Sequence, residues 1–427
     1  MKLFQPIQGS IESKETQENL IDRGQLQVNV TSSVNAFPVK EARISISYTG
    51  IPESILEQVV TDSSGQTELV ELNAPPEEWS LDENEERQPY SEYTLNIEAE
   101  GFESISVSGT EILANTKAIQ NIRMKQKDQS REEEQVFVIP AHTLYGNYPP
   151  KIAEEEIKPV NETGEIVLSR VVVPEYIIVH DGSPRDSTAQ NYYVKYKDYI
   201  KNVASSEIYA TWPADTIRAN VLAIMSFTLN RVYTEWYRNK GFDFTITSST
   251  AFDHKWIPER NIFEPISVIV DELFADYPNV RQPILTQYCD GRRVSCPNWL
   301  TQWGSKSLGE QGFSPIEILR YYYGDDMYIN TAEAISGIPS SWPGYTLEQG
   351  SQGPKVRQIQ EELNVIAGAY PEIPKLTEDG IYGSETEAAV RKFQSIFGLP
   401  VTGEIDYKTW YKISEIYVGV SRIAELS

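Results

Sequence analysis

The sequence is poor in cysteine, histidine and basic residues. Its 427 residues include 2 Cys and 3 His, too few for a disulfide-dense scaffold or a four-thiolate zinc site. The 37 Lys and Arg stand against 62 Asp and Glu, and the net charge of −25 argues against binding to nucleic acid or to an anionic membrane. No apolar run reaches the roughly 20 residues of a spanning helix, and residues 1–6 show no Sec signal. We expect a globular chain without nucleic-acid partners or membrane insertion.

The length and the changes in pattern predict a multidomain α+β fold of about three domains, at roughly 150 residues each. Residues 24–124 alternate apolar and polar positions between turn signals, which predicts a β-sandwich within 1–124. This sandwich resembles the transthyretin-like type, which carries no catalytic residues and can equally be a plain folding or adhesion module. Residues 125–134 contain no apolar side chain, so 125–135 should be an exposed, cleavable linker. An α+β domain over 136–343 and a helical domain over 344–427 follow.

The tail contains the most specific pattern. Helices are expected at 355–367, 384–397 and 406–416, with Asp-Gly-Ile-Tyr-Gly at 379–383 between the first two. The spacing closely resembles the three-helix peptidoglycan-binding domain of wall hydrolases. Tyr382 and Trp410 either edge a groove that stacks on sugar rings or belong to the helical core.

The central region resembles the SpoIID family of lytic transglycosylases. The matching motifs are residues 199–207, 212–220, 299–304 and 316–324, spread over about 160 residues and including Gln302 and Trp303 in the Gln-Trp-Gly motif. The chain departs from the family where it has Met225 in place of an arginine, and Cys-Pro-Asn at 296–298 in place of a histidine-containing stretch. Arg218 or Arg231 could supply the missing cation.

The resemblance places Glu207 at the position of the catalytic glutamate. Cleavage of a glycosidic bond needs a proton at the leaving oxygen, and one buried carboxylic acid with a raised pKa can deliver it. In a transglycosylase the same carboxylate then takes the proton of the muramic acid's own hydroxyl, which closes an anhydro ring. The alternative from the residues alone is a glutamate that caps or pairs a helix.

The family also implies polar and aromatic groups that line a substrate groove. Asp253, His254 and Trp256 match those positions, although a lone histidine is more often structural. Cys289 and Cys296 can form a hairpin disulfide or stay reduced. With His254 they give at most three ligands at no recognised spacing, so we expect neither a metal site nor a cofactor.

The order of sandwich, SpoIID-like domain and peptidoglycan-binding domain resembles the clostridial spore cortex-lytic enzymes. It implies a germination-specific zymogen, located in the cortex or coat region of the spore, that cleaves cortex glycan strands to anhydro-muramic ends. A subtilisin-like Csp protease would activate it. We place the cleavage between Gln135 and Val136, with release of the sandwich. The alternatives are a hydrolytic muramidase that uses Asp215 or Asp253 to activate water, and a non-catalytic peptidoglycan-binding structural protein.

Overall fold

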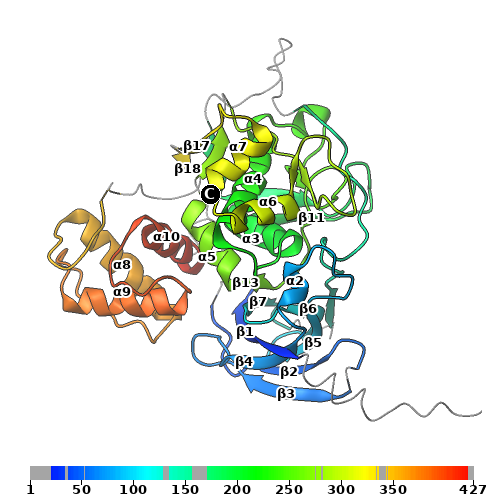
Figure 1. Cartoon of the computed structure of the whole chain (residues 1–427). Helices are drawn as coiled ribbons and strands as arrows, with labels where there is room; N and C mark the ends of the chain where they lie inside the picture. Colours follow the sequence, from blue (N-terminus) through cyan, green and yellow to red (C-terminus); the bar gives the residue numbers. More distant parts are fainter. Residues whose placement is uncertain are drawn as a thin grey trace, which may run out of the picture.

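The computed structural model describes most of the chain. The described residues are 21–33, 37–51, 53–127, 134–155, 171–274, 276–279, 282–332, 334–335, 343 and 345–421. They form a mixed α+β structure with a helical C-terminal part (Figure 1).

The N-terminal part consists of two sheets that share a core. Their elements are β1 (Asp22–Ser32), β2 (Arg43–Tyr48), β3 (Ile55–Val60), β4 (Val70–Ala74), α2 (Glu78–Leu81), β5 (Ser91–Glu98), β6 (Ile105–Ile112), β7 (Lys117–Met124) and β8 (Gln135–Val138). One sheet has the order β13-β7-β1-β4 and the other β3-β2-β5-β6-β8. Alternate residues of β1, such as Leu26, Val28 and Val30, are fully buried, as the period of a strand with one core face requires.

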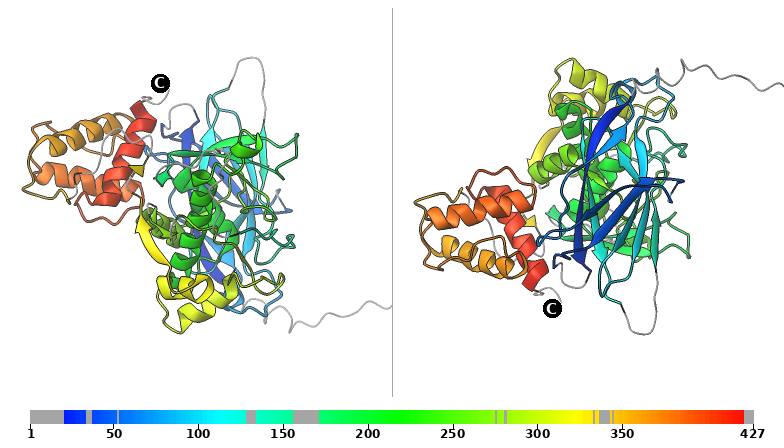
Figure 2. Two further views of the ribbon diagram at one scale, coloured as in Figure 1. Left: turned by 90° about the horizontal axis from the view of Figure 1, so that it is seen from above. Right: turned by 90° about the horizontal axis from the view of Figure 1, so that it is seen from below.

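The central part surrounds one buried helix. Its elements are β9 (Val172–Val173), β10 (Tyr176–His180), β11 (Asn191–Lys195), α3 (Tyr196–Glu207), α4 (Ala214–Tyr233), η1 (Arg238–Lys240), β12 (Ile246–Thr247), β13 (Ile262–Phe263), α5 (Glu264–Leu273), β14 (Asp276–Asn279), β15 (Tyr288–Cys289), β16 (Leu300–Thr301), α6 (Gln302–Glu310), α7 (Pro315–Tyr323), β17 (Tyr328–Thr331) and β18 (Ala334–Ile335). Helix α4 begins after Pro213 and is buried on almost every side, because α3, α5, α6 and α7 pack around it (Figure 2).

The sandwich and the central part share one continuous hydrophobic core. Strand β13 of the central part pairs with β7 through Ile262 and Phe263. The Glu111 carboxylate of β6 forms a buried ion pair of 2.6 Å with Arg260. The sequence did not predict this union, and it makes the two parts one packed body.

The predicted linker is structured at both described ends. Lys127 N donates to Gly101 O at 2.9 Å, and strand β8 runs parallel to β6 with Gln135 opposite Ile105. The exposed joint therefore does not extend to Gln135, and residues 136–138, expected in the 136–343 domain, pair with the sandwich sheet instead. The linker residues 128–133 lie outside the described part.

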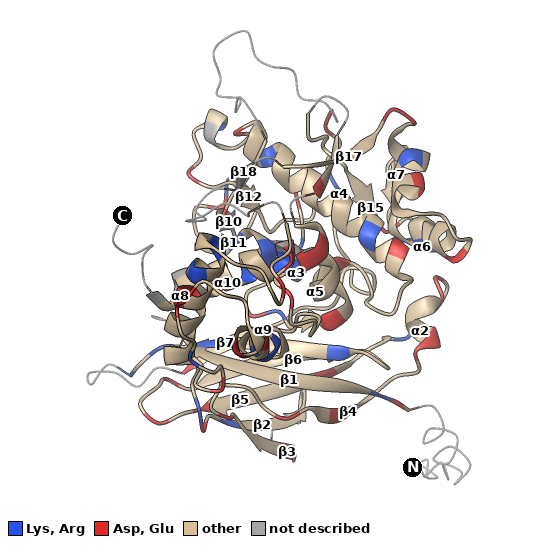
Figure 3. Ribbon diagram, turned by 90° about the vertical axis from the view of Figure 1, so that its left-hand side faces the viewer, with Lys and Arg blue, Asp and Glu red and all other residues tan. Residues whose placement is uncertain are grey.

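The tail has a core of its own, made by α8 (Pro354–Ala369), α9 (Ser384–Ile396) and α10 (Tyr407–Ser421). These bounds agree closely with the three helices expected from the sequence. Helix α10 lies beside the central part (Figure 1), where Glu415 pairs with Lys195 and Lys197, both at 3.3 Å. Figure 3 shows the basic residues of α3 and α10 on this side of the molecule. None of the described helices is both long enough and apolar enough to cross a bilayer.

Candidate active site

A cavity of about 140 Å³ lies at the C-terminal end of α3. Glu207, the last residue of that helix, forms part of its wall together with Gln302, the first residue of α6. The rest of the wall comes from the segment between Thr143 and Lys151, from Thr250, and from β15 with the loop that follows it. The site therefore joins segments far apart in the sequence.

The Glu207 carboxylate is nearly inaccessible, with 3% of the residue exposed. Its Oε1 accepts a hydrogen bond from the backbone N–H of Lys255 at 2.6 Å, and its Oε2 accepts one from the Tyr288 hydroxyl. Burial raises the pKa of Glu207, and the positive charge of Lys151 and these two hydrogen bonds oppose the rise. A raised pKa keeps the proton on the carboxyl at higher pH, as a general acid requires.

Two residues beside Glu207 were not among the candidates from the sequence. Tyr288 lines the cavity next to Cys289, and burial and the Glu207 charge raise its pKa well above the ordinary value. The Lys151 ammonium lies over the rings of Phe227 and Tyr288, at 5.1 and 5.2 Å, and donates to the carbonyl oxygen of Asp253. Burial lowers the pKa of Lys151, and the charges of Glu207 and Asp253 oppose that change. Their signals in the sequence were slight: a tyrosine before a cysteine, and a lysine after two prolines.

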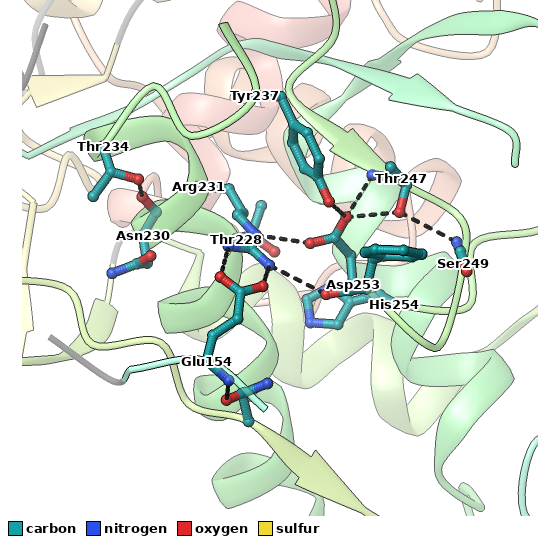
Figure 4. A network of polar contacts seen from close by, with 12 residues as sticks. Glu154, Thr228, Asn230, Arg231, Thr234, Tyr237, Thr247, Ser249, Asp253 and His254 are labelled. Atoms are coloured by element: carbon teal, nitrogen blue, oxygen red, sulfur yellow. Dashed lines mark hydrogen bonds and ion pairs between the residues drawn. The ribbon is translucent and has the colours of Figure 1, made fainter. Parts of the chain in front are cut away.

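Asp253 is held in a network of polar contacts (Figure 4), which adjoins the cavity through the hydrogen bond from Lys151 to the Asp253 carbonyl oxygen. Its Oδ1 accepts from Arg231 Nε at 2.7 Å, while its Oδ2 accepts from the Tyr237 hydroxyl at 2.6 Å and from the backbone and hydroxyl of Thr247 at 2.9 and 2.7 Å. Arg231 also pairs with Glu154 at 2.7 Å, and its side chain is completely buried. Asp253 and Arg231 thus anchor the floor of the site and are not part of the cavity wall, contrary to the expectation that Asp253 lines the groove.

His254 and Trp256 are also buried and do not line the cavity. The His254 ring lies 4.4 Å from Phe227, and its Nδ1 is 3.0 Å from the Tyr199 hydroxyl. Burial, Lys151 and Arg231 hold the pKa of His254 well below its ordinary value, so the ring is neutral. Trp256 packs against Tyr192, with ring centroids 5.0 Å apart. Both residues pack in the interior of the protein, outside the cavity wall.

The two residues of the Gln302-Trp303 motif have different surroundings: the first lines the cavity and the second is buried in the core. Gln302 lines the cavity, and its Nε2 donates to the carbonyl oxygen of Glu207 at 2.9 Å, which fixes the end of α3. Trp303 is 6% exposed and packs 5.0 Å from Trp212. Gln302 thus holds the C-terminal end of α3 in place, and Trp303 packs in the core beside Trp212.

Three further candidates lie away from the cavity. Arg218 forms an ion pair with Glu272 at the side of α4, so it is not placed to contact a glycan there. Tyr382 and Trp410 are 1% and 0% exposed, and the Tyr382 hydroxyl donates to Gly403 O at 2.8 Å. Of the two alternatives that the sequence left open for these rings, the structure has the second, because both are part of the helical core and neither edges a groove.

A disulfide between Cys289 and Cys296 closes the loop that carries one side of the site. Asp290 accepts hydrogen bonds from the backbone N–H groups of Arg293 at 2.8 Å and Val294 at 2.9 Å, which stabilises the turn. Gly291 has a φ of +81° and packs so closely on Thr301 that a Cβ atom would lie 2.5 Å from it. The loop is therefore compact. Of the two states that the sequence left open for Cys289 and Cys296, the structure has the disulfide.

Within the described residues, the cavity wall contains nothing from the sandwich strands. Nor do the described His, Cys, Asp and Glu residues gather into a group of three that could bind a metal ion. The described wall has the Tyr288 hydroxyl next to the Glu207 carboxyl, and it contains the cations Lys151 and Arg293.

Comparison with known proteins identifies the tail. Residues 352–413 match the family described as "Putative peptidoglycan binding domain". The zinc D-Ala-D-Ala carboxypeptidase of Streptomyces albus G is 39% identical over 77 residues, which are 18% of this chain and 28% of that enzyme's length. The C-terminal domain is thus a peptidoglycan-binding domain, with peptidoglycan as its partner.

Two kinds of solved structure resemble parts of the chain. The N-terminal domain of SleB matches with 28% identity and a TM-score of 0.16, over 18% of this chain and 99% of that one. Catechol 1,2-dioxygenase from Acinetobacter sp. ADP1 matches with 10% identity and a TM-score of 0.19, over 27% of this chain and 58% of that one.

Proposed function

We propose that the chain is a lytic transglycosylase that cleaves the bond between N-acetylmuramic acid and N-acetylglucosamine in peptidoglycan, with Glu207 as the general acid. The observation that carries the proposal is a buried carboxyl with a raised pKa in a cavity wall, in a chain whose tail is a peptidoglycan-binding domain. Binding to the wall brings the glycan to the acid, and the acid supplies the proton that bond cleavage needs.

The hydrogen bonds of Glu207 favour one position for that proton. Oε1 accepts from the Lys255 peptide N–H, which can only donate, so the proton is best placed on Oε2 beside the Tyr288 hydroxyl. Protonation of the glycosidic oxygen leaves positive charge on the sugar, and the resulting Glu207 carboxylate stabilises it. The same carboxylate then takes the proton of the muramic acid 6-hydroxyl as that oxygen closes the 1,6-anhydro ring.

The contacts of the other acids favour ring closure over attack by water. Asp290 is the other carboxylate of the cavity wall, and two backbone N–H groups occupy it. Asp253 is enclosed by four donated hydrogen bonds, and Asp215 is exposed in the first turn of α4, outside the wall. A hydrolytic muramidase built on either Asp215 or Asp253 is therefore the weaker alternative.

A purely structural, non-catalytic role is also less well supported. That alternative depended on Met225 as the mark of a decayed site. Met225 is fully buried inside α4, so packing in the core accounts for an apolar residue there.

We further propose that the intact chain is a zymogen of the SleC type, the clostridial spore cortex-lytic enzyme that its domain order resembles. The cavity of about 140 Å³ is well below the roughly 300 Å³ of a typical ligand pocket. Its cover is the segment between Thr143 and Lys151, which begins shortly after β8. Cleavage between Gln135 and Val136 by a subtilisin-like protease would cut β8 after its first residue and free this cover to move. On this account the cover, and not the sandwich, masks the site in the spore cortex or coat region.

Glu207→Gln tests the proposal, because the amide nearly preserves the shape of the side chain but cannot donate the proton. We expect cleavage of purified cortex by the proteolytically processed chain to fall by about 3 orders of magnitude, the middle of the range for a positioned acid. Sedimentation with cortex should be unchanged. Glu310→Gln is the matched control and should retain full activity; the Glu310 side chain is 52% exposed and pairs with Lys306 of the same helix α6. Residual activity of Glu207→Gln above a tenth of wild type would refute the assignment.

A further inference from the structure

Lys151 brings a positive charge into the cavity from a segment that precedes the catalytic helix by about 50 residues in the sequence. It lines the cavity together with Glu207. Its ammonium donates to the Asp253 carbonyl oxygen and lies over the rings of Phe227 and Tyr288, at 5.1 and 5.2 Å from their centres. The Tyr288 hydroxyl in turn donates to the Glu207 carboxylate. The Tyr288 side chain therefore lies beside both charged groups.

The chain directly after Lys151 is fixed to the central part of the protein. The Ile152 N–H donates to Ala251 O at 2.7 Å, and the Ile152 carbonyl oxygen accepts from Gln287 Nε2 at 2.8 Å. The Glu154 N–H donates to Gln287 Oε1 at 2.9 Å. This end of the cover is therefore held by its own hydrogen bonds, and the ammonium stays in the cavity wall when the rest of the cover moves.

The positive charge beside Glu207 comes from two lysines. Three tyrosine hydroxyls near the carboxyl stay neutral, because burial raises the pKa of each; they belong to Tyr148, Tyr199 and Tyr288. The lysines are Lys151 and Lys255, and the charge of Lys151 opposes the rise of the Glu207 pKa more strongly than that of Lys255 does. The Lys255 ammonium lies over the Tyr148 ring, at 5.3 Å from its centre.

The other acids around Lys151 have their own partners. The Asp253 carboxylate is paired with a buried arginine at 2.7 Å, and the Asp290 carboxylate of the wall accepts from two backbone N–H groups. His254 is neutral, because burial and nearby cations hold its pKa well below the ordinary value. Burial lowers the pKa of Lys151, and the charge of Glu207 opposes this change more than that of any other acid. Lys151 and Glu207 thus act mainly on each other.

The proposed reaction needs Glu207 in both of its protonation states. The carboxyl gives its proton to the glycosidic oxygen, remains as a carboxylate beside the charged sugar, and then takes the proton of the muramic acid 6-hydroxyl. Burial alone would keep the proton on Glu207. We propose that Lys151 is a positioning residue for this acid, and that its ammonium stabilises the carboxylate between the two proton transfers while it keeps its own protons. This inference rests on the proposed function, whose acid it concerns.

The test compares Lys151→Gln, which removes the charge, with Lys151→Arg, which keeps it. The full chain, cleaved in the 125–135 region, is assayed on soluble glycan between pH 4 and pH 9. We expect Lys151→Gln to move the alkaline limb of kcat/KM upward by about 1 pH unit or more, the scale of an opposite charge a few ångströms from a carboxyl. At low pH its kcat should fall by up to roughly tenfold, with KM little changed, because proton donation then leaves a less stable carboxylate. Lys151→Arg should keep the alkaline limb of the wild type.

Lys306→Gln is the matched control. The Lys306 side chain is 7% exposed and pairs with Glu310 on α6, a helix that begins at the cavity, but it lies outside the cavity wall. This substitution removes the same charge and should leave the alkaline limb unchanged. A lower kcat of Lys151→Gln without a change of that limb, or an equal shift in Lys306→Gln, would overturn the inference, because a merely structural role does not move the titration of Glu207.

Urea unfolding provides a readout that does not need cleavage. The stability difference between Glu207→Gln and wild type grows with pH until the folded Glu207 has lost its proton. In the Lys151→Gln background this difference should continue to grow to a pH about 1 unit higher. If the wild type cleaves no glycan, the proposed function fails, whereas this shift would still support the interaction of the two charges. An unchanged profile would overturn the inference even if the wild type cleaves, and the comparison also decides the question if Lys151→Arg does not fold.

Discussion

Removal of the Glu111 carboxylate should destabilise the sandwich and the central part together. Glu111 is on β6, and its partner Arg260 precedes β13 in the central part; their side chains are 1% and 0% exposed. Arg260 Nη2 also donates to the carbonyl oxygen of Ser205, two residues before Glu207, at 2.5 Å. Its Nε and Nη1 have no hydrogen-bond partner within the described residues. Glu111→Ala would therefore leave a buried guanidinium without its counter-charge.

The expected cost follows from this geometry. Loss of one partner from a buried ion pair costs about 3–5 kcal/mol. For a body of about 150–250 residues or more, 1 kcal/mol shifts Tm by roughly 2–4 °C, so we expect a fall of about 6–20 °C. Removal of both charges in Glu111→Ala/Arg260→Met should recover part of the loss, because the remaining buried charge is then gone.

Thermal unfolding followed by calorimetry measures this effect. The control is Lys117→Ala, which breaks an ion pair of 3.0 Å with Glu264 across the same junction; the Glu264 side chain is 41% exposed, so a loss below about 1 kcal/mol is expected. The sandwich and the central part should unfold in one transition. Separate transitions, a Glu111→Ala variant as stable as the control, or a double variant less stable than Glu111→Ala would refute the reasoning.

The remaining predictions concern the acid, the joint and the tail. Because burial raises the pKa of Glu207, its contribution to the free energy of unfolding is complete at low pH and is lost as pH rises through the folded pKa. In urea unfolding, Glu207→Gln should therefore become more stable relative to wild type as pH rises from 4 to 8. A stability difference that does not change with pH would contradict the raised pKa. Protease cleavage between Gln135 and Val136 should leave the sandwich bound to the rest in gel filtration, since the shared core and the β7–β13 pairing remain; free sandwich without denaturant would contradict this prediction. Deletion of 344–427 should reduce retention on cortex more than cleavage of soluble glycan, and equal loss on both would show that the tail supports the catalytic fold.

The sequence predicted local elements better than it predicted their association. The helices of the tail were predicted to within a few residues, because apolar spacing and flanking glycines mark them locally. Glu207 was chosen on a different basis, its resemblance to the catalytic glutamate of the SpoIID family. The β8 strand was assigned to the wrong part, since its four residues carry no sign of the β6 strand with which they pair.

Prediction of the site from the sequence was limited in the same way, because the association of distant segments could not be predicted. Tyr288 and Lys151 lie beside Glu207 only because β15 and the segment after β8 meet at the end of α3, and neither residue belongs to a recognisable motif. Conversely, Tyr382 and Trp410 had the chemistry of sugar-stacking residues but are buried. Burial of an aromatic side chain depends on tertiary packing, which composition and spacing do not determine.

The end groups of digested cortex test the central claim most directly. The processed wild-type chain is incubated with purified cortex, and the released fragments are examined by mass spectrometry. Our account predicts 1,6-anhydro-muramic ends from the wild type and none from Glu207→Gln, because one carboxyl both protonates the leaving oxygen and closes the ring. Reducing muramic ends that incorporate ¹⁸O from labelled water would contradict the transglycosylase mechanism, and anhydro ends at the wild-type level from Glu207→Gln would contradict the role of Glu207.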